Sequence, residues 1–279
     1  MNLLKKGQAT GREIVGLDSG ALEYVGFDAY RLAPGESLEL PPAQTEVCVV
    51  LLCGAIDVDV THPQHGEHRW ADLRGRASVF DDASPHAVYA PSRSTLRVTA
   101  LAGGSGGSGG SGGAEVAICR APGDPGAGLP PRLIAPASIP RSVRGAGSNT
   151  RYVRDILPET EAAYSLLVVE VVTPPGHSSS YPPHKHDTAR PGQETFLEET
   201  YYHRVDPEQG FVLQRVYTDD RSLDEAMAAE NHDVVRVPRG YHPVIVPHGY
   251  TSYYLNVMAG PERKWLFHDD PRHAWLRSG

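Results

Sequence analysis

Short apolar runs separated by glycine and proline form the main pattern along this chain. The runs are rich in Val, Leu, Ile and Tyr and are bounded by turns that contain Gly or Pro. β-Branched and aromatic residues favour strands, and closely spaced turns between strands are typical of antiparallel sheets. The predicted strands cover residues 46–59, 87–89, 96–101, 115–119, 165–172, 211–218, 233–237 and 252–257. The pattern therefore predicts an all-β sandwich or barrel.

Helical signals are scarce in this pattern. The strongest lies at residues 222–229, a stretch of good helix formers around Leu223 and Met227. It predicts one or two helical turns within a loop, so any helices should be short.

A Gly/Ser-rich segment at residues 103–113 reads GGSGGSGGSGG. Such a segment has no side chains to bury and behaves as a flexible coil. Because strand-like runs lie on both sides of it, we expect a hairpin loop here and not a linker between domains.

Residues 122–140 mark a better domain boundary, because Pro, Gly and Ala dominate there and the strand pattern disappears. We therefore predict one domain over residues 1–130, which carries the Gly/Ser-rich segment and contains no His-x-His. The second domain is predicted over residues 131–279, and the chemistry is expected in it.

Composition narrows the partners and the compartment. The chain has 279 residues, 40% of them hydrophobic, which is enough for a large core. Its formal net charge of -8 disfavours nucleic acids and anionic membranes, since both attract basic surfaces. No apolar run is long enough to span a membrane, and the first residues are too short for a signal peptide. Cys48, Cys53 and Cys119 are expected as buried, reduced thiols, which fits the cytoplasm.

Three histidines and a carboxylate in the second half have the spacing of a metal site. His184 and His186 lie at i and i+2, so both side chains would project from one face of a strand. Glu199 opens the next strand-like stretch, and His242 follows a Pro-x-Gly turn further on. Such a set suits a divalent transition metal and leaves coordination positions open for water or substrate. Zinc is the first candidate, with manganese or iron as alternatives, because these ligands accept several metals.

Glu198 competes with Glu199 as the carboxylate ligand. In a strand, Glu199 shares a face with Tyr201, whereas Glu198 shares the other face with Tyr202. Strand-forming residues follow the carboxylate on either face. Alternation therefore places Glu198 and Glu199 on opposite faces but does not show which of them is the ligand. We prefer Glu199 as the ligand and keep Glu198 as the alternative.

These residues resemble the two sequence motifs of the cupin superfamily of small β-barrels. The cupin motifs run G, H-x-H, E, G and then P-x-G-x-x-H followed by N. The matching positions are Gly176, His184, His186, Glu199 and Gly210, then Pro238, Gly240, His242 and Asn256. Two departures stand out: the gap after His186 is long, which requires a looped excursion over residues 187–198, and His242 comes one residue early.

Longer strings resemble one cupin family in particular, the 5-deoxy-glucuronate isomerases of bacterial myo-inositol catabolism. They cover residues 183–187, 198–204, 214–220, 230–233, 238–243 and 253–260, and extend back through Arg144, Gly145, Asn149 and Arg151. The resemblance implies a bicupin, two cupin barrels in one chain, of which only the second keeps its metal ligands. It also implies an aldose–ketose isomerase that converts 5-deoxy-D-glucuronate to 5-dehydro-2-deoxy-D-gluconate through an enediolate.

Such a reaction needs groups that carry protons and a cation that binds the carboxylate of the sugar acid. Residues of suitable type for proton transfer are Glu198, His232, Tyr241 and Tyr254, with His203 and Tyr201 as further candidates. A tyrosine in this region could instead line the barrel with its hydroxyl hydrogen-bonded. The candidate cations are Arg239, Arg190 and Lys185, with Arg204 and Arg215 as alternatives.

Two other functions are compatible with the same ligand set. A cupin Fe(II) dioxygenase would use a similar ligand set but would require iron and consume oxygen. A non-catalytic cupin would bind a sugar acid and leave it unchanged. The exposed edges of paired barrels would also suit a homo-oligomer, although nothing in the chain specifies the number of subunits.

Overall fold

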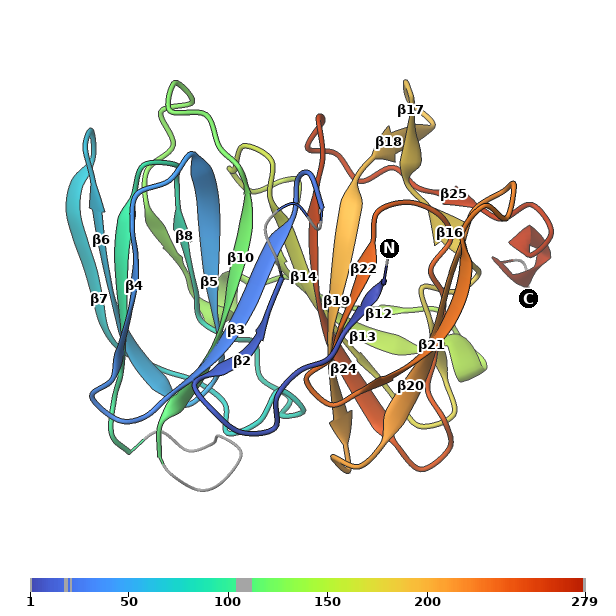
Figure 1. The fold of residues 1–279 in the computed structure, drawn as a ribbon, viewed down its shortest axis with the longest axis horizontal. Coiled ribbons are helices and arrows are strands. Elements are labelled where there is room, and N and C mark those ends of the chain that lie inside the picture. The colour runs from blue at the N-terminus through green and yellow to red at the C-terminus, as the bar shows by residue number, and fades with distance from the viewer. Residues whose placement is uncertain (1, 18–19, 21, 104–111, 278–279) are drawn as a thin grey trace.

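Two β-barrels lie side by side in the computed structural model, which describes residues 2–17, 20, 22–103 and 112–277 (Figure 1). Each barrel combines a larger sheet near the middle of the molecule with a four-stranded sheet on the outside. The strands pair in antiparallel fashion within both barrels. The predicted all-β architecture is confirmed.

The first barrel contains strands from β2 to β11. Its six-stranded sheet has the order β11 (Arg132–Ile134), β8 (Ala87–Ala90), β5 (Thr45–Cys53), β10 (Ala114–Pro122), β3 (Gly26–Leu32) and β2 (Glu13–Gly16). The four-stranded sheet has the order β4 (Ser37–Leu40), β9 (Thr95–Ala100), β6 (Ala55–His62) and β7 (Gly66–Arg74). In β6, buried Ile56, Val58 and Val60 alternate with more exposed Asp57 and Asp59, so one face of the strand fills the barrel.

The second barrel is built in the same way. Its seven-stranded sheet has the order β1 (Leu4–Lys5), β22 (Val234–Val237), β19 (Glu198–Asp206), β24 (Thr251–Ala259), β14 (Leu167–Thr173), β13 (Arg151–Leu157) and β12 (Arg141–Arg144). The four-stranded sheet has the order β15 (Ser178–Ser179), β23 (Val244–Ile245), β20 (Phe211–Tyr217) and β21 (Asp224–Glu230). Because β1 from the start of the chain pairs with β22, the second barrel includes residues from both ends of the sequence. The division of the chain at residue 130 stays a prediction.

Two small antiparallel strand pairs complete the second barrel. They are β16 (His184–Lys185) with β25 (His268–Asp269), and β17 (Asp187–Arg190) with β18 (Glu194–Phe196). The second pair is the excursion that the long gap before Glu199 required.

The helices among the described residues are three short 3-10 turns, η1 (Pro136–Ser138), η2 (Gly147–Asn149) and η3 (Ala274–Arg277). No helix in this part of the chain is long and apolar enough to cross a membrane. The helical turns predicted at residues 222–229 are wrong, because residues 224–230 form β21 and pair with β20 along its whole length. Cross-strand pairing thus outweighs the helix propensity of this stretch, which is a weak preference per residue.

The hairpin predicted around the Gly/Ser-rich segment is also wrong. Strand β9 pairs with β4 and β6, whereas β10 pairs with β3 and β5, so the flanking strands belong to different sheets. The segment therefore connects the two sheets of the first barrel. The sequence also predicted that residues 103–113 form a flexible coil. Of these, residues 104–111 lie outside the described part of the chain.

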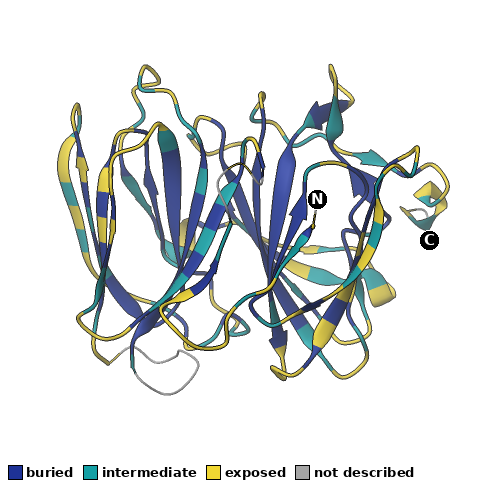
Figure 2. Cartoon of the chain, in the orientation of Figure 1, coloured by how far each residue is buried: buried dark blue, intermediate teal, exposed yellow. Residues whose placement is uncertain are grey.

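Three apolar clusters form the core. One fills the first barrel, one lies inside the second, and the third lies between the two large sheets. The central cluster joins side chains of both barrels, among them Phe27 and Tyr202, whose ring centroids are 5.4 Å apart. It also contains Cys48 and Cys119, and all three cysteines are free and buried, as expected. The strands at the centre are consequently buried on both faces, as Figure 2 shows.

Two glutamates tie the barrels together by a reciprocal exchange of hydrogen bonds. Glu46 in β5 accepts hydrogen bonds of 2.5 to 2.9 Å from the backbone amides of residues 164–166 in the second half. Glu198 in β19 accepts bonds of 2.6 to 3.3 Å from the amides of residues 23–25 in the first half. Each carboxylate thereby satisfies loop amides that would otherwise lie at the interface without partners.

A buried ion-pair cluster reinforces the same interface. Both oxygens of Glu170 in β14 accept hydrogen bonds from the guanidinium group of Arg76, at 2.6 and 2.7 Å, and Arg154 adds a third at 2.9 Å. Burial would raise the pKa of Glu170, but the two guanidinium groups outweigh it and hold the pKa below its ordinary value. Glu170 therefore stays ionised in the folded protein and links residues that are distant in sequence.

We predict that Glu170→Gln lowers the free energy of unfolding at pH 7 by about 3–5 kcal/mol, because it leaves two buried guanidinium groups without a counter-charge. Since the folded-state pKa is lowered, this stabilisation is fully present above the ordinary value of 4.5 and is lost as pH falls through the folded pKa. Urea titrations of both proteins at several pH values would test this. The exposed Glu39, paired with Arg97, supplies the control Glu39→Gln, which should change little. A difference between Glu170→Gln and the unmodified protein that is small at pH 7, or that grows below pH 4.5, would contradict the assignment.

Candidate metal centre and its cavity

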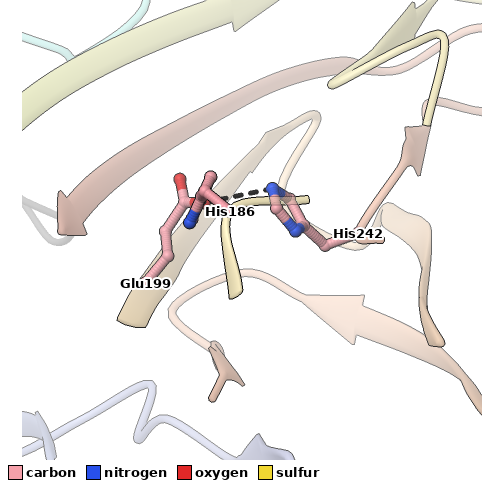
Figure 3. Close-up of side chains that lie close together, drawn as sticks. All are labelled: His186, Glu199 and His242. Atoms are coloured by element: carbon pink, nitrogen blue, oxygen red, sulfur yellow. Dashed lines mark hydrogen bonds and ion pairs between the residues drawn. The ribbon is translucent and has the colours of Figure 1, made fainter. Parts of the chain in front are cut away.

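His186, Glu199 and His242 converge inside the second barrel, and each offers one ligand atom within 4.8 Å of the others. Figure 3 shows the two imidazoles pointing toward the carboxylate. His186 follows β16, Glu199 lies at the start of β19, and His242 lies in the turn between β22 and β23. The three side chains are 2%, 3% and 0% exposed, so bulk water does not solvate them.

Backbone carbonyls orient both imidazoles. Nδ1 of His186 lies 2.9 Å from the carbonyl oxygen of Leu197, and Nδ1 of His242 lies 2.8 Å from that of Gly240. A neutral imidazole that donates from Nδ1 presents its Nε2 lone pair, which is the form that binds metals. Both Nε2 atoms then face Glu199.

The arrangement around Oε2 of Glu199 fits a bound cation. Nε2 of His186 lies 3.1 Å and Nε2 of His242 lies 3.2 Å from this oxygen, yet Nε2 of His242 is buried and makes no hydrogen bond. Burial would raise the pKa of Glu199, but His242 and His186 outweigh it and lower the pKa to about 2. A divalent cation among the three would satisfy the unpartnered nitrogen and balance the carboxylate.

Gly240 allows the turn that delivers His242. Its φ of +96° lies in the left-handed region, and an added Cβ would approach the carbonyl oxygen of Tyr217 to 2.5 Å. Its amide donates to Oδ2 of Asp187 at 2.9 Å. The turn is thereby fixed to the small hairpin after His186, and only glycine fits this position without displacing the backbone.

His184, the fourth predicted ligand, lies beside this cluster without belonging to it. Its ring centroid is 5.0 Å from that of His242 and 6.4 Å from that of His186. Burial, followed by the neighbouring His242 and His186, holds the pKa of His184 well below its usual range. The side chain lines the cavity described below.

The two adjacent glutamates point to opposite sides of the large sheet. Glu199 faces the barrel interior with the histidines, whereas Glu198 faces the first barrel and binds its loop amides. The structure therefore brings Glu199 into the cluster and keeps Glu198 away from it. Neither the alternative ligand role nor the proton-transfer role considered for Glu198 fits this position.

A cavity of approximately 480 Å³ opens beside the cluster. His184, Glu199, Tyr201 and Tyr254 line one part of it. Other lining residues include the valines of β13 and β14 and three arginines, Arg144, Arg151 and Arg277. The cavity thus combines ligand groups, hydroxyl groups, an apolar wall and positive charge.

Of the proton-transfer candidates, Tyr254 lies in this cavity, and so does Tyr201. The Tyr254 hydroxyl is hydrogen-bonded to Ser179 Oγ, and that of Tyr201 lies 2.9 Å from Ser180 Oγ. Burial raises the pKa of Tyr254, so its hydroxyl keeps its proton at neutral pH.

The other proton-transfer candidates lie outside the cavity lining. The Tyr241 hydroxyl donates to Oδ1 of Asp219 at 2.8 Å, and Nδ1 of His232 lies 2.9 Å from the Tyr202 hydroxyl on the far face of the sheet. His203 is buried against Gln214. Strand alternation explains why His232 lies away from the cavity. It contacts Tyr202, which points to the face of β19 opposite to that of Glu199 and Tyr201.

None of the three residues predicted to bind the substrate carboxylate lines the cavity. Lys185 is buried but neutralised, with Nζ 2.5 Å from Asp187 and 3.0 Å from Glu194. Arg190 and Arg239 are exposed. The cavity is lined instead by Arg144 and Arg151, both present in the strings that carried the family resemblance, and by Arg277, for which the sequence offered no signal.

Comparisons with known proteins show which family the chain resembles. The sequence model of the KduI/IolB family matches residues 3–276. Proteins named 5-deoxy-glucuronate isomerase from Geobacillus thermodenitrificans and Bacillus subtilis strain 168 are 48% and 47% identical to the chain. The two matches cover 93% and 91% of the chain, respectively. Each covers 88% of the relative.

Solved structures extend the likeness to three dimensions. An IolB-like protein from Salmonella typhimurium LT2 superposes with a TM-score of 0.91 at 47% identity, over 99% of this chain and 100% of the other. A Bacillus subtilis oxalate decarboxylase superposes with a TM-score of 0.63 at 13% identity, over 96% of this chain and 79% of the other. The second likeness shows the shared cupin fold alone.

We predict that Glu199→Gln weakens zinc binding at least about 100-fold, because it removes the anionic ligand. The matched variant Glu198→Gln should keep its zinc and lose about 1–3 kcal/mol of stability, since an amide cannot accept all the loop hydrogen bonds. Metal analysis after dialysis, with urea unfolding of both variants, measures the two effects. Equal metal loss in both variants, or full retention in Glu199→Gln, would show that the strand register does not select the ligand.

Proposed function

This chain belongs to the KduI/IolB family, and we propose that it is an aldose–ketose isomerase of myo-inositol degradation. The proposed reaction converts 5-deoxy-D-glucuronate to 5-dehydro-2-deoxy-D-gluconate. The observation that carries it is a cavity that reaches Glu199 of the His186, Glu199 and His242 cluster and is also lined by arginines. A sugar acid needs both features, since its reacting end carries a carbonyl and a hydroxyl while its other end carries a carboxylate.

The isomerisation moves a proton from C2 to C1 as the carbonyl passes from C1 to C2. A divalent cation, when bound, supplies Lewis acidity to the oxygens at these carbons. His186, Glu199 and His242 would hold it, with His184 adjacent as a further ligand. Zinc suits this role because the reaction involves no net oxidation, and the nitrogen and oxygen donors are compatible with it.

We infer that the cavity hydroxyls assist this proton transfer. Tyr254 and Tyr201 are hydrogen-bonded to Ser179 and Ser180, which hold their hydroxyl groups at the cavity wall. A protonated phenol donates a hydrogen bond to an oxygen that gains negative charge, and a pre-oriented donor stabilises an enediolate more than the starting aldehyde. We assign Tyr254 this donor role, with Tyr201 beside it at a ring-centroid distance of 4.9 Å.

We expect zinc-loaded protein, kept free of oxygen, to convert 5-deoxy-D-glucuronate to the ketose. Proton NMR in D₂O would show loss of the C1 signals of the aldose and deuterium entering the product. A chelator should abolish conversion, and added zinc should restore it. Absence of conversion by fully loaded protein would reject the isomerase. Oxygen-dependent consumption with iron would then favour a dioxygenase, and unchanged bound sugar would favour a binding protein.

A further inference from the structure

Three arginines line the cavity, but two of them are already neutralised. Arg144 donates to both oxygens of Asp155, at 3.1 and 3.3 Å. Arg277 forms an ion pair with Asp269, with Nη2 2.7 Å from Oδ1. These two guanidinium groups have their carboxylate partners within the protein.

Arg151 differs from both, because no carboxylate among the described residues lies within ion-pair distance of it. Its Nη1 donates to the carbonyl oxygen and to the side-chain Oδ1 of Asn149, both at 3.0 Å. Asn149 is fixed in turn, since its Nδ2 donates to the carbonyl oxygen of Tyr181 at 2.8 Å. Neutral oxygens therefore orient Arg151 and leave its charge and its other N–H groups for a ligand.

The surroundings of Arg151 favour an anion. The group is partly buried, and burial lowers the pKa of Arg151, which the nearby Arg144 and Arg277 lower further. An incoming carboxylate would balance the charge of Arg151, whose hydrogen bonds go to neutral oxygens. A guanidinium group suits the task, since it can bind a carboxylate through two parallel hydrogen bonds.

The wall next to Arg151 fits the rest of the proposed substrate. Arg151 and Val153 project from the same face of β13, and Val153 lies directly opposite Val171 of β14. Both valines line the cavity. In 5-deoxy-D-glucuronate the carbon next to the carboxylate is a methylene group, which suits an apolar wall better than a hydroxyl-bearing carbon would.

We propose that Arg151 binds the C6 carboxylate of the sugar acid, places the C5 methylene against Val153 and Val171, and so positions C1 and C2 at the histidine–glutamate cluster. This inference rests on the proposed function, because it takes the substrate from it. It makes Arg151 a positioning residue that selects acidic sugars, with Asn149 holding its guanidinium group.

Binding measurements separate this role from catalysis. The probes are the C1-reduced form of 5-deoxy-D-glucuronate, which cannot isomerise, and its neutral counterpart with an alcohol at C6. Calorimetry with zinc-loaded protein should show that Arg151→Gln weakens binding of the acid about 10- to 100-fold and leaves binding of the neutral sugar nearly unchanged. Arg151→Lys should recover part of the loss. Arg190→Gln, on the exposed hairpin outside the cavity, should change neither value more than about two-fold.

Each outcome has a distinct meaning. Equal weakening of both sugars by Arg151→Gln and Arg151→Lys, or unchanged affinity for the acid, would overturn the assignment of Arg151. Turnover by the unmodified protein in the NMR assay, combined with either result, would leave the isomerase intact. Selective loss of acid binding without turnover by the unmodified protein would support the carboxylate site and reject the isomerase.

Discussion

The alternation of side chains along β19 is the constraint on which the rest of this structure depends. Successive residues of a strand point to opposite faces, so Glu198 and Glu199 must serve different barrels. Glu198 binds loop amides of the first barrel, and Glu199 meets His186 and His242 inside the second. A shift of one residue in register would exchange the two carboxylates and disrupt the interface and the candidate metal centre together.

The interface explains why a single strand can carry both tasks. Glu46 and Glu198 each bind three backbone amides of the opposite half, and Glu170 joins Arg76 to Arg154 across the central core. Partners on both faces restrain the position of β19. Because Glu199 belongs to this strand, its position is restrained as well. Coordination requires ligands held within a few tenths of an ångström, which a strand buried on both faces provides better than a loop.

The two barrels use their interiors differently. In the first, apolar side chains such as Leu51, Val58 and Val98 form a continuous buried cluster. In the second, the apolar cluster includes Tyr201 and Tyr254, and both tyrosines also line the cavity together with His184 and Glu199. Among the described residues, the candidate metal centre and the cavity beside it therefore belong to the second barrel.

Sequence reasoning predicted the fold and picked out three residues that converge inside the second barrel, because both depend on local spacing. Period-two patterning predicts strands, and His-x-His with a downstream glutamate and histidine identifies His186, Glu199 and His242. It misplaced residues whose roles depend on distant partners. The sequence predicted Lys185 as a cation available to substrate, but in the fold Asp187 and Glu194 form ion pairs with it. The sequence likewise predicted helical turns where β21 pairs with β20. Arg151 stood in the strings that carried the resemblance, but only the folded cavity distinguishes it from arginines that already have carboxylate partners.

Anomalous diffraction from crystals of the zinc-loaded protein tests the central claim most directly, because it locates the metal without relying on activity or on a variant. The account predicts one strong peak in the second barrel, within about 2.0–2.3 Å of the Nε2 atoms of His186 and His242 and of the Glu199 carboxylate, with Glu198 still bound to the loop of the first barrel. Fully loaded protein whose peak lies elsewhere, or whose peak is ligated by Glu198, would contradict it.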